Sequence, residues 1–198
     1  MIDWKDVIFV DIDTQFDFMA PDGALYVPGA EEIKPVLKKI TEFAVKNNIP
    51  IIGSVDAHSE KDPEFKNFPP HCIKNTPGYE KIPETKTENM ILIPNEEGYY
   101  EKIEPGKQII FEKQTFSIFD NVNLDKILKD CERRKVIIYG VATEYCVKKA
   151  AEGFVERGYT TYLVKDAIKG IDKKEEEKTI ENLKSKGVKI VTFKDFKI

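Results

Sequence analysis

The chain has 198 residues, 41% of them hydrophobic, which is enough for one well-buried core, and no linker divides it. Its net charge of −4, from 31 basic and 35 acidic residues spread along the sequence, offers no basic stripe for a nucleic-acid backbone. The first residues lack a basic region and aspartates interrupt their apolar run, so we expect neither a signal peptide nor a membrane span. We therefore expect one cytoplasmic domain over residues 1–198.

Apolar runs and helical patterns alternate along the chain. Residues 7–13 predict the first strand, and the apolar positions between residues 33 and 44 repeat at helical spacing. The remaining strands are expected at 49–58, 108–113, 135–141, 160–167 and 188–193, with 90–94 as a candidate for a small extra strand. Further helices are expected through 124–131, 147–155 and 172–183. This order predicts a Rossmann-like, three-layer α/β/α fold around a mainly parallel six-stranded sheet.

Reactive side chains follow four of the predicted strands. A parallel sheet binds its ligand beyond the carboxyl ends of its strands, and these ends carry Asp13, Asp56 with His58, Lys113, and Cys146 just beyond the fourth. Each residue alone has an ordinary explanation, such as a turn cap, a loop histidine or a solvated lysine. It is less expected that all four residues lack a function at the same crevice than that they form one functional site.

Cys146 falls where a predicted strand turns into a helix. At such a turn a side chain can face a cleft beside free backbone N–H groups, which lower a thiol pKa and stabilise a negative oxygen. The alternative is a buried cysteine acting as a small hydrophobic residue. The three cysteines, an odd number at wide spacings, indicate free thiols rather than a disulfide framework.

An aspartate, a lysine and a cysteine at one crevice suit nucleophilic catalysis. Lys113 as a cation would favour the thiolate of Cys146, and Asp13 could accept the thiol proton and pass it to a departing amine. Backbone N–H groups near Ala142 and Cys146 would be the oxyanion donors. The reaction class is amide hydrolysis through a thioester.

Both histidines lie close to the second strand end and to the long, irregular segment 59–87, and loops of such length are commonly functional. Asp56 and His58, two residues apart on an extended strand end, point to the same side, and His71 returns after a loop that contains Glu64. Two imidazoles with one or two carboxylates suit Zn²⁺, Mn²⁺ or Fe²⁺, although the spacing matches no zinc finger.

Over nearly its whole length the sequence resembles the nicotinamidase family of the isochorismatase-like cysteine hydrolases. The motifs that carry the resemblance are Asp-x-Gln-x-Asp-Phe at 13–18, Asp-x-His at 56–58 with the later His71, the lysine of FEKQTFSIF, and Gly-Val-Ala-Thr-x-Tyr-Cys-Val at 140–147. The resemblance implies a catalytic triad of Asp13, Lys113 and Cys146. Asp11, on the same strand, is the alternative acid if the register is shifted.

The resemblance also implies the rest of the site. The metal ligands would be Asp56, His58 and His71, with Glu64 added in some relatives, and Zn²⁺ is the metal we expect first. A cis peptide bond is implied between Val141 and Ala142, beside the oxyanion donors. The aromatic side chains that sandwich the substrate ring would be Phe18, Phe68 and Phe116.

The activity implied is hydrolysis of nicotinamide to nicotinate and ammonia, which feeds NAD salvage. A single hydrolase domain would carry it, and the sequence does not decide whether the protein is a monomer or a homo-oligomer. The alternative within the enzyme class is a related cysteine amidase that acts on another small amide, such as a carbamoyl or ureido compound or a pyrazinamide-like analogue. A further alternative is a nucleotide-binding or redox-sensing module, but no G-x-G-x-x-G or P-loop follows any strand. In many relatives a Trp occupies the position of Ala57, so the pocket here is expected to be wider.

Overall fold

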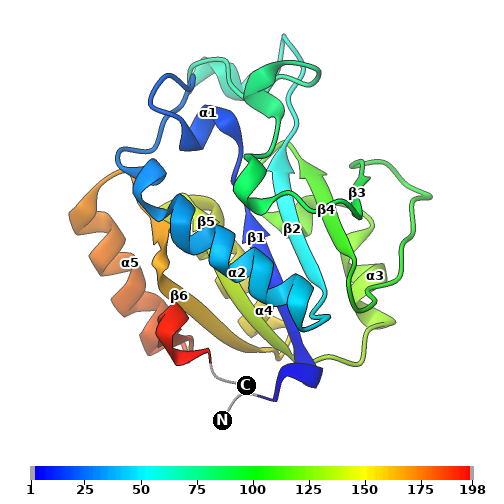
Figure 1. Cartoon of the computed structure of the whole chain (residues 1–198). Helices are drawn as coiled ribbons and strands as arrows, with labels where there is room; N and C mark the ends of the chain where they lie inside the picture. Colours follow the sequence, from blue (N-terminus) through cyan, green and yellow to red (C-terminus); the bar gives the residue numbers. More distant parts are fainter. Residues whose placement is uncertain (1–2, 197–198) are drawn as a thin grey trace.

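A computed structural model describes residues 3–196, which include a sheet of seven parallel strands. Figure 1 shows the sheet with the helices that pack against it. The spatial order is β3-β4-β2-β1-β5-β6-β7. The strands are β1 (Val7–Ile12), β2 (Ile51–Asp56), β3 (Met90–Ile93), β4 (Gln108–Lys113), β5 (Lys135–Val141), β6 (Thr160–Lys169) and β7 (Lys189–Val191). The predicted fold class is confirmed. The expected count of six strands is corrected to seven, because the short apolar run at 90–93 pairs with β4 and completes that edge.

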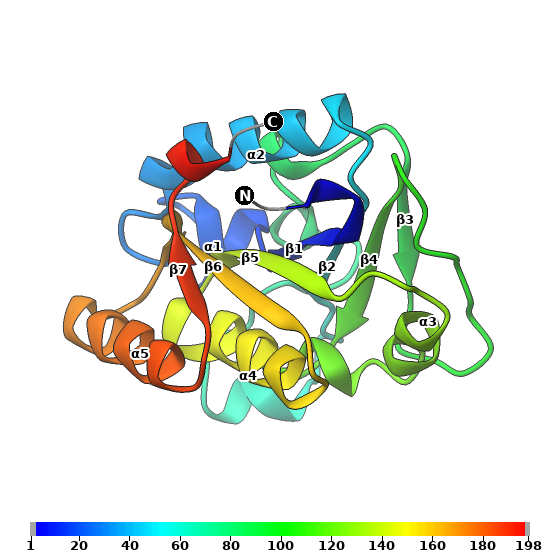
Figure 2. The same cartoon turned by 90° about the horizontal axis from the view of Figure 1, so that it is seen from below.

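Helices cover both faces of the sheet, as Figure 2 shows. On one face lies α2 (Lys34–Lys46), and on the other lie α3 (Leu124–Lys129), α4 (Lys148–Glu156) and α5 (Lys173–Ser185). Successive side chains of a strand point to opposite faces of the sheet, so the strands contribute to two hydrophobic cores. Phe9 of β1 packs in the core on the α2 side, and Ile8 packs in the core on the α4 side. Of the helices in the described part of the chain, none has the length and apolar character that a membrane span needs.

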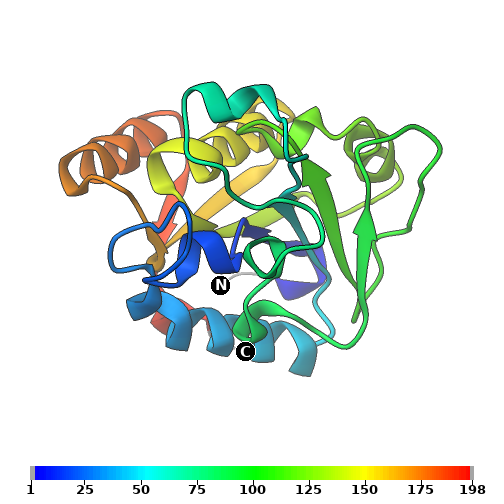
Figure 3. The same cartoon turned by 90° about the horizontal axis from the view of Figure 1, so that it is seen from above.

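The chain reverses its direction across the sheet at β1. From β1 it runs through α2 to β2 and on towards the β3 edge, and it returns to β5 on the opposite side of β1. Connections therefore diverge beyond the carboxyl ends of β1 and β5, where parallel sheets of this type bind ligands. The short helix α1 (Phe16–Met19) and the first part of the long segment 59–87 lie over these ends, as seen in Figure 3, whereas residues 83–85 of that segment contact α2.

Gly140 lets the ends of β1 and β5 approach closely. Its φ is +118°, and a Cβ at this position would lie 2.0 Å from the carbonyl oxygen of Ile12. Only glycine fits, because both the backbone conformation and the close contact exclude a side chain. The approach brings the turn after β5 next to the residue that follows β1.

Candidate active site

Lys113, the last residue of β4, is the charged centre of the site. Its Cα is paired in register with that of Asp56 on β2, and its side chain is completely buried. The Nζ atom lies 2.9 Å from Oδ2 of Asp13, forms an ion pair with Oδ1 of Asp56, and donates to the carbonyl of Thr115 at 2.9 Å. Burial alone would lower the pKa of Lys113, but Asp13 and Asp56 raise it well above its usual value. The lysine is therefore a cation.

Cys146 lies on a π-helical turn (Thr143–Val147) between β5 and α4. Its Sγ is 3.5 Å from Nζ of Lys113, and 7% of the residue is exposed. The sequence led us to expect a lowered thiol pKa at this turn, and here the structure differs. Burial raises the pKa of Cys146 well above its usual value, although Lys113 acts in the opposite direction. The free thiol is therefore protonated and needs a base.

Asp13 supplies a carboxylate at the place where that base is needed. The residue directly follows β1 in a left-handed conformation, with φ +50°, and one of its carboxylate oxygens lies within 4.8 Å of Sγ of Cys146. Ser54 on β2 donates from Oγ to Oδ1 at 2.7 Å and thereby orients the carboxylate. Burial raises the pKa of Asp13, while Lys113 opposes the shift.

Asp11, the alternative acid, belongs to a different cluster. Its Oδ2 accepts a hydrogen bond from Nζ of Lys81 at 2.7 Å, and its Oδ1 accepts one from Thr14 at 2.9 Å. Both lysine and aspartate are buried. The structure thus places Asp13, rather than Asp11, beside the cysteine.

Asp56, His58 and His71 form a compact group of potential metal ligands. One ligand atom from each lies within 4.8 Å of the others. Oδ2 of Asp56 is 3.9 Å from Nε2 of His58 and 3.8 Å from Nε2 of His71. Oε2 of Glu64 is 3.9 Å from the same His58 nitrogen.

These residues fit a divalent cation. His58 is fully buried, and neither of its ring nitrogens has a hydrogen-bond partner among the residues that the structure describes, although Asp62 lies beside Nδ1. A buried ring nitrogen without a partner is costly, and a metal ion would satisfy it. Two imidazoles with carboxylate oxygens are a donor set that suits Zn²⁺, Mn²⁺ or Fe²⁺. Asp56 joins this group of potential metal ligands to the group around Lys113, since its other oxygen, Oδ1, contacts Lys113.

The three predicted aromatic residues line one pocket with Cys146 and Asp13. The rings of Phe68 and Phe116 are 6.0 Å apart and nearly perpendicular, and the ring of Phe18 is 5.6 Å from that of His71. The same pocket is bounded at the turn after β5 by Val141 and Ala142, and the peptide bond between these two residues is cis.

The chain is similar to known proteins over most of its length. The family model described as the isochorismatase domain matches residues 7–195. The chain belongs to the isochorismatase family. It is 29% identical to the isochorismatase family protein PncA of Bacillus subtilis over 163 residues, which covers 79% of this chain and 82% of that protein. It is 25% identical to the nicotinamidase of Saccharomyces cerevisiae over 216 residues, with coverage of 91% and 96%.

A solved structure of this family is also similar. The pyrazinamidase of Pyrococcus horikoshii in complex with zinc superposes with a TM-score of 0.80 at 32% sequence identity, covering 95% of this chain and 99% of that one. The match extends over both chains almost completely.

Several residues of the site do not follow from the sequence reasoning. Ser54 could have been found, because it precedes Asp56 by two residues and therefore shares its face of β2. The pocket wall is completed by Leu25, Val27, Tyr145 and Ile171, which come from loops and a helical turn, where no periodicity marks a direction.

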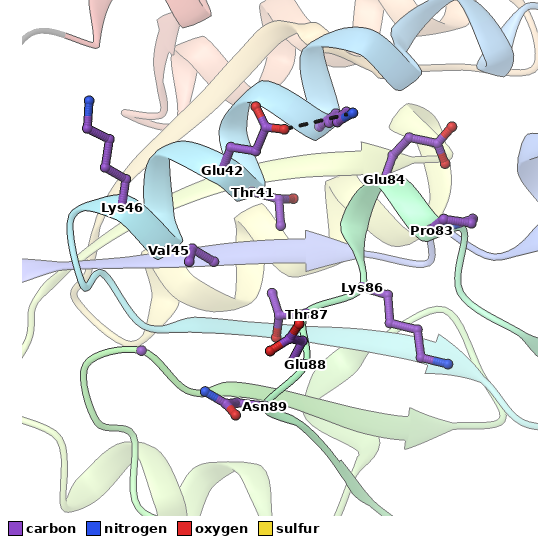
Figure 4. Close-up of a pocket in the computed structure, with 12 residues that line it drawn as sticks. Thr41, Glu42, Val45, Lys46, Pro83, Glu84, Lys86, Thr87, Glu88 and Asn89 are labelled. Atoms are coloured by element: carbon purple, nitrogen blue, oxygen red, sulfur yellow. Dashed lines mark ion pairs between the residues drawn. The ribbon is translucent and has the colours of Figure 1, made fainter.

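A wider surface hollow lies elsewhere, between α2 and the segment 83–89 (Figure 4). Charged side chains of both signs line it, including Glu42, Lys46, Glu84 and Lys86. None of its described lining residues belongs to the predicted site. The smaller pocket beside Cys146 is the one lined by the predicted catalytic and metal-binding side chains.

Proposed function

We propose that this protein is a nicotinamidase, an amidohydrolase that converts nicotinamide to nicotinate and ammonia and so feeds NAD salvage. The observation that carries the proposal is the contact of Lys113 with both Cys146 Sγ, at 3.5 Å, and Asp13 Oδ2, at 2.9 Å, beside an aromatic pocket. The family membership and the relatives named nicotinamidase and pyrazinamidase support the same substrate class.

The residues of the site account for each proton in the reaction. Asp13 accepts the thiol proton of Cys146, and the sulfur attacks the carboxamide carbon to give a tetrahedral intermediate. The backbone N–H groups of Ala142 and Cys146 are the donors that we assign to the resulting oxyanion. Asp13 then returns the proton to the nitrogen, the C–N bond breaks, and ammonia leaves a thioester. A water molecule gives one proton to Asp13 and attacks the thioester, the C–S bond breaks, and Asp13 passes that proton to the sulfur to restore the thiol. The acid product loses its remaining proton to solvent and leaves as nicotinate.

The remaining groups hold the substrate. Phe18, Phe68 and Phe116 provide flat apolar surfaces for a neutral aromatic ring. Asp56, His58 and His71, with Glu64 nearby, would hold a divalent cation, for which Zn²⁺ is supported by the zinc complex of the Pyrococcus relative. When bound, that cation would supply a Lewis-acidic contact for the ring nitrogen of the substrate. Lys113 lies between these two parts of the site, where it opposes the effect of burial on the carboxyl pKa values of Asp13 and Asp56 and so favours their ionised forms.

The test is ammonia release from nicotinamide by the purified, Zn²⁺-loaded protein. We expect turnover in the wild type and a loss of about 10³-fold or more in Cys146→Ala, because the nucleophile is removed. Cys131→Ala is the matched control, since this cysteine is also 7% exposed and lies outside the pocket lining. Undiminished turnover in Cys146→Ala would refute the mechanism. Faster turnover of a carbamoyl or ureido compound than of nicotinamide would refute the substrate assignment.

A further inference from the structure

The carboxylate of Asp62 lies behind the imidazole of His58. Oδ2 of Asp62 is 3.0 Å from Nδ1 of His58, an ion-pair contact that is not aligned as a hydrogen bond, and the other ring nitrogen, Nε2, is the one near Asp56. The His58 side chain is fully buried and that of Asp62 is 12% exposed, so water competes little for this contact. A carboxylate on the far nitrogen of a metal-binding histidine fixes the ring orientation and the tautomer.

The second oxygen of the same carboxylate fixes the turn that carries Glu64. Oδ1 of Asp62 accepts a hydrogen bond from the backbone N–H of Glu64 at 2.9 Å and caps the 3₁₀ helix Pro63–Lys66. Glu64 in turn extends Oε2 to within 3.9 Å of Nε2 of His58. One carboxylate thus contacts one potential ligand directly and holds the backbone of another.

The two histidines of the site are supported differently. Nδ1 of His71 hydrogen-bonds to the carbonyl oxygen of Pro69 at 2.8 Å, which is a neutral partner. The His58 and His71 rings are 4.8 Å apart, and both contact the ring of Phe65, at 5.4 and 5.7 Å. Packing therefore fixes both rings, but within the described residues only His58 has a carboxylate at Nδ1.

We propose that Asp62 is a positioning residue of the metal site, which holds the proton of His58 on Nδ1, leaves Nε2 free to bind the cation, and increases cation affinity. The inference rests on the metal site of the proposed function. The negative charge of Asp62 matters because Lys113 is a cation in contact with Asp56, and Lys113 would repel a metal ion bound nearby. A further carboxylate offsets this repulsion.

The experiment measures Zn²⁺ affinity of the metal-free, full-length protein by competition with a chromogenic chelator, together with the visible absorption spectrum of the Co²⁺-loaded protein. Asp62→Asn removes the charge and keeps the shape. Asp62→Ser retains a residue that caps helices well but is too short to reach His58. We expect both variants to bind Zn²⁺ about 10–100-fold more weakly, with altered Co²⁺ bands. Glu60→Gln, an exposed carboxylate in the same loop, is the matched control and should leave both readouts unchanged.

The outcomes separate this inference from the proposed function. Wild-type protein without tight Zn²⁺ binding would refute the metal site itself. Tight wild-type binding with Zn²⁺ affinities within about twofold in both Asp62 variants would refute only the positioning role. An equal loss in Glu60→Gln would also refute it, because long-range charge would then explain the effect. Thermal unfolding of the metal-free variants, with midpoints within about 3 °C of the wild type, checks that the fold is retained.

Discussion

Asp13 must be ionised before it can accept the thiol proton of Cys146. Burial raises the pKa of Asp13 above the ordinary value of about 3.9, with Lys113 acting in the opposite direction. Below its pKa the carboxyl group carries a proton and cannot serve as a base. We therefore expect kcat/KM for nicotinamide to decrease with falling pH along a limb centred above about pH 4, and steady-state kinetics across pH would locate it.

Ser54→Ala assigns that limb to Asp13. The serine hydroxyl donates to Oδ1 of Asp13 at 2.7 Å, and such a bond favours the ionised form. Its removal should move the limb to higher pH by up to about one unit. Thr161→Val, which removes a buried hydroxyl bonded to the carbonyl of Tyr159, is the control and should not move it. A limb that stays in place in Ser54→Ala would show that another group governs the profile.

A buried ion pair holds the segment around Lys81 against β1. Nζ of Lys81 is 2.7 Å from Oδ2 of Asp11, and the two side chains are 2% and 0% exposed. Lys81→Met would leave the aspartate buried without its cation, so we expect the free energy of unfolding to fall by about 3–5 kcal/mol. Urea denaturation of the metal-free protein measures this change.

Two further variants decide whether the charge is responsible. Adding Asp11→Asn to Lys81→Met removes the unpaired charge and should recover most of the loss. Lys38→Met removes an exposed ion pair with Glu42, at 3.9 Å, and should change the stability by less than about 1 kcal/mol. If Lys81→Met also falls in that small range, the buried pair does not hold the segment in place.

At the same scale, strands with continuous apolar runs could be predicted well. Residues 108–113 were expected as a strand and form β4 with the same bounds. The last strand was expected at 188–193 and is shorter, Lys189–Val191, because residues 193–195 turn into a 3₁₀ helix capped by Thr192 and Asp195. Side-chain caps of this kind end a strand even where the sequence is still apolar, and hydrophobic periodicity does not reveal them.

For the whole molecule, the sequence predicts where reactive residues gather but not how loops support them. Asp13, Lys113 and Cys146 could be placed together because parallel strands end at the same edge of the sheet. The contacts of Asp62 with His58, and the position of Ile171 in the pocket wall, depend on the path of long loops. A one-dimensional pattern does not encode such a path, since irregular segments have no fixed period.

Metal binding should stabilise the whole fold, because its proposed ligands join the end of β2 to the separate segment that carries His71. A ligand at 100 times its Kd that binds only the native state adds about 2.7 kcal/mol. For a chain of this length that corresponds to an increase of roughly 5–11 °C in Tm. We expect this increase when Zn²⁺ is added to metal-free protein in a thermal unfolding experiment, and its loss on chelation. Cys131→Ala should retain the increase and His71→Ala should lose it. An equal increase in His71→Ala would mean that the cation stabilises the protein from some other site.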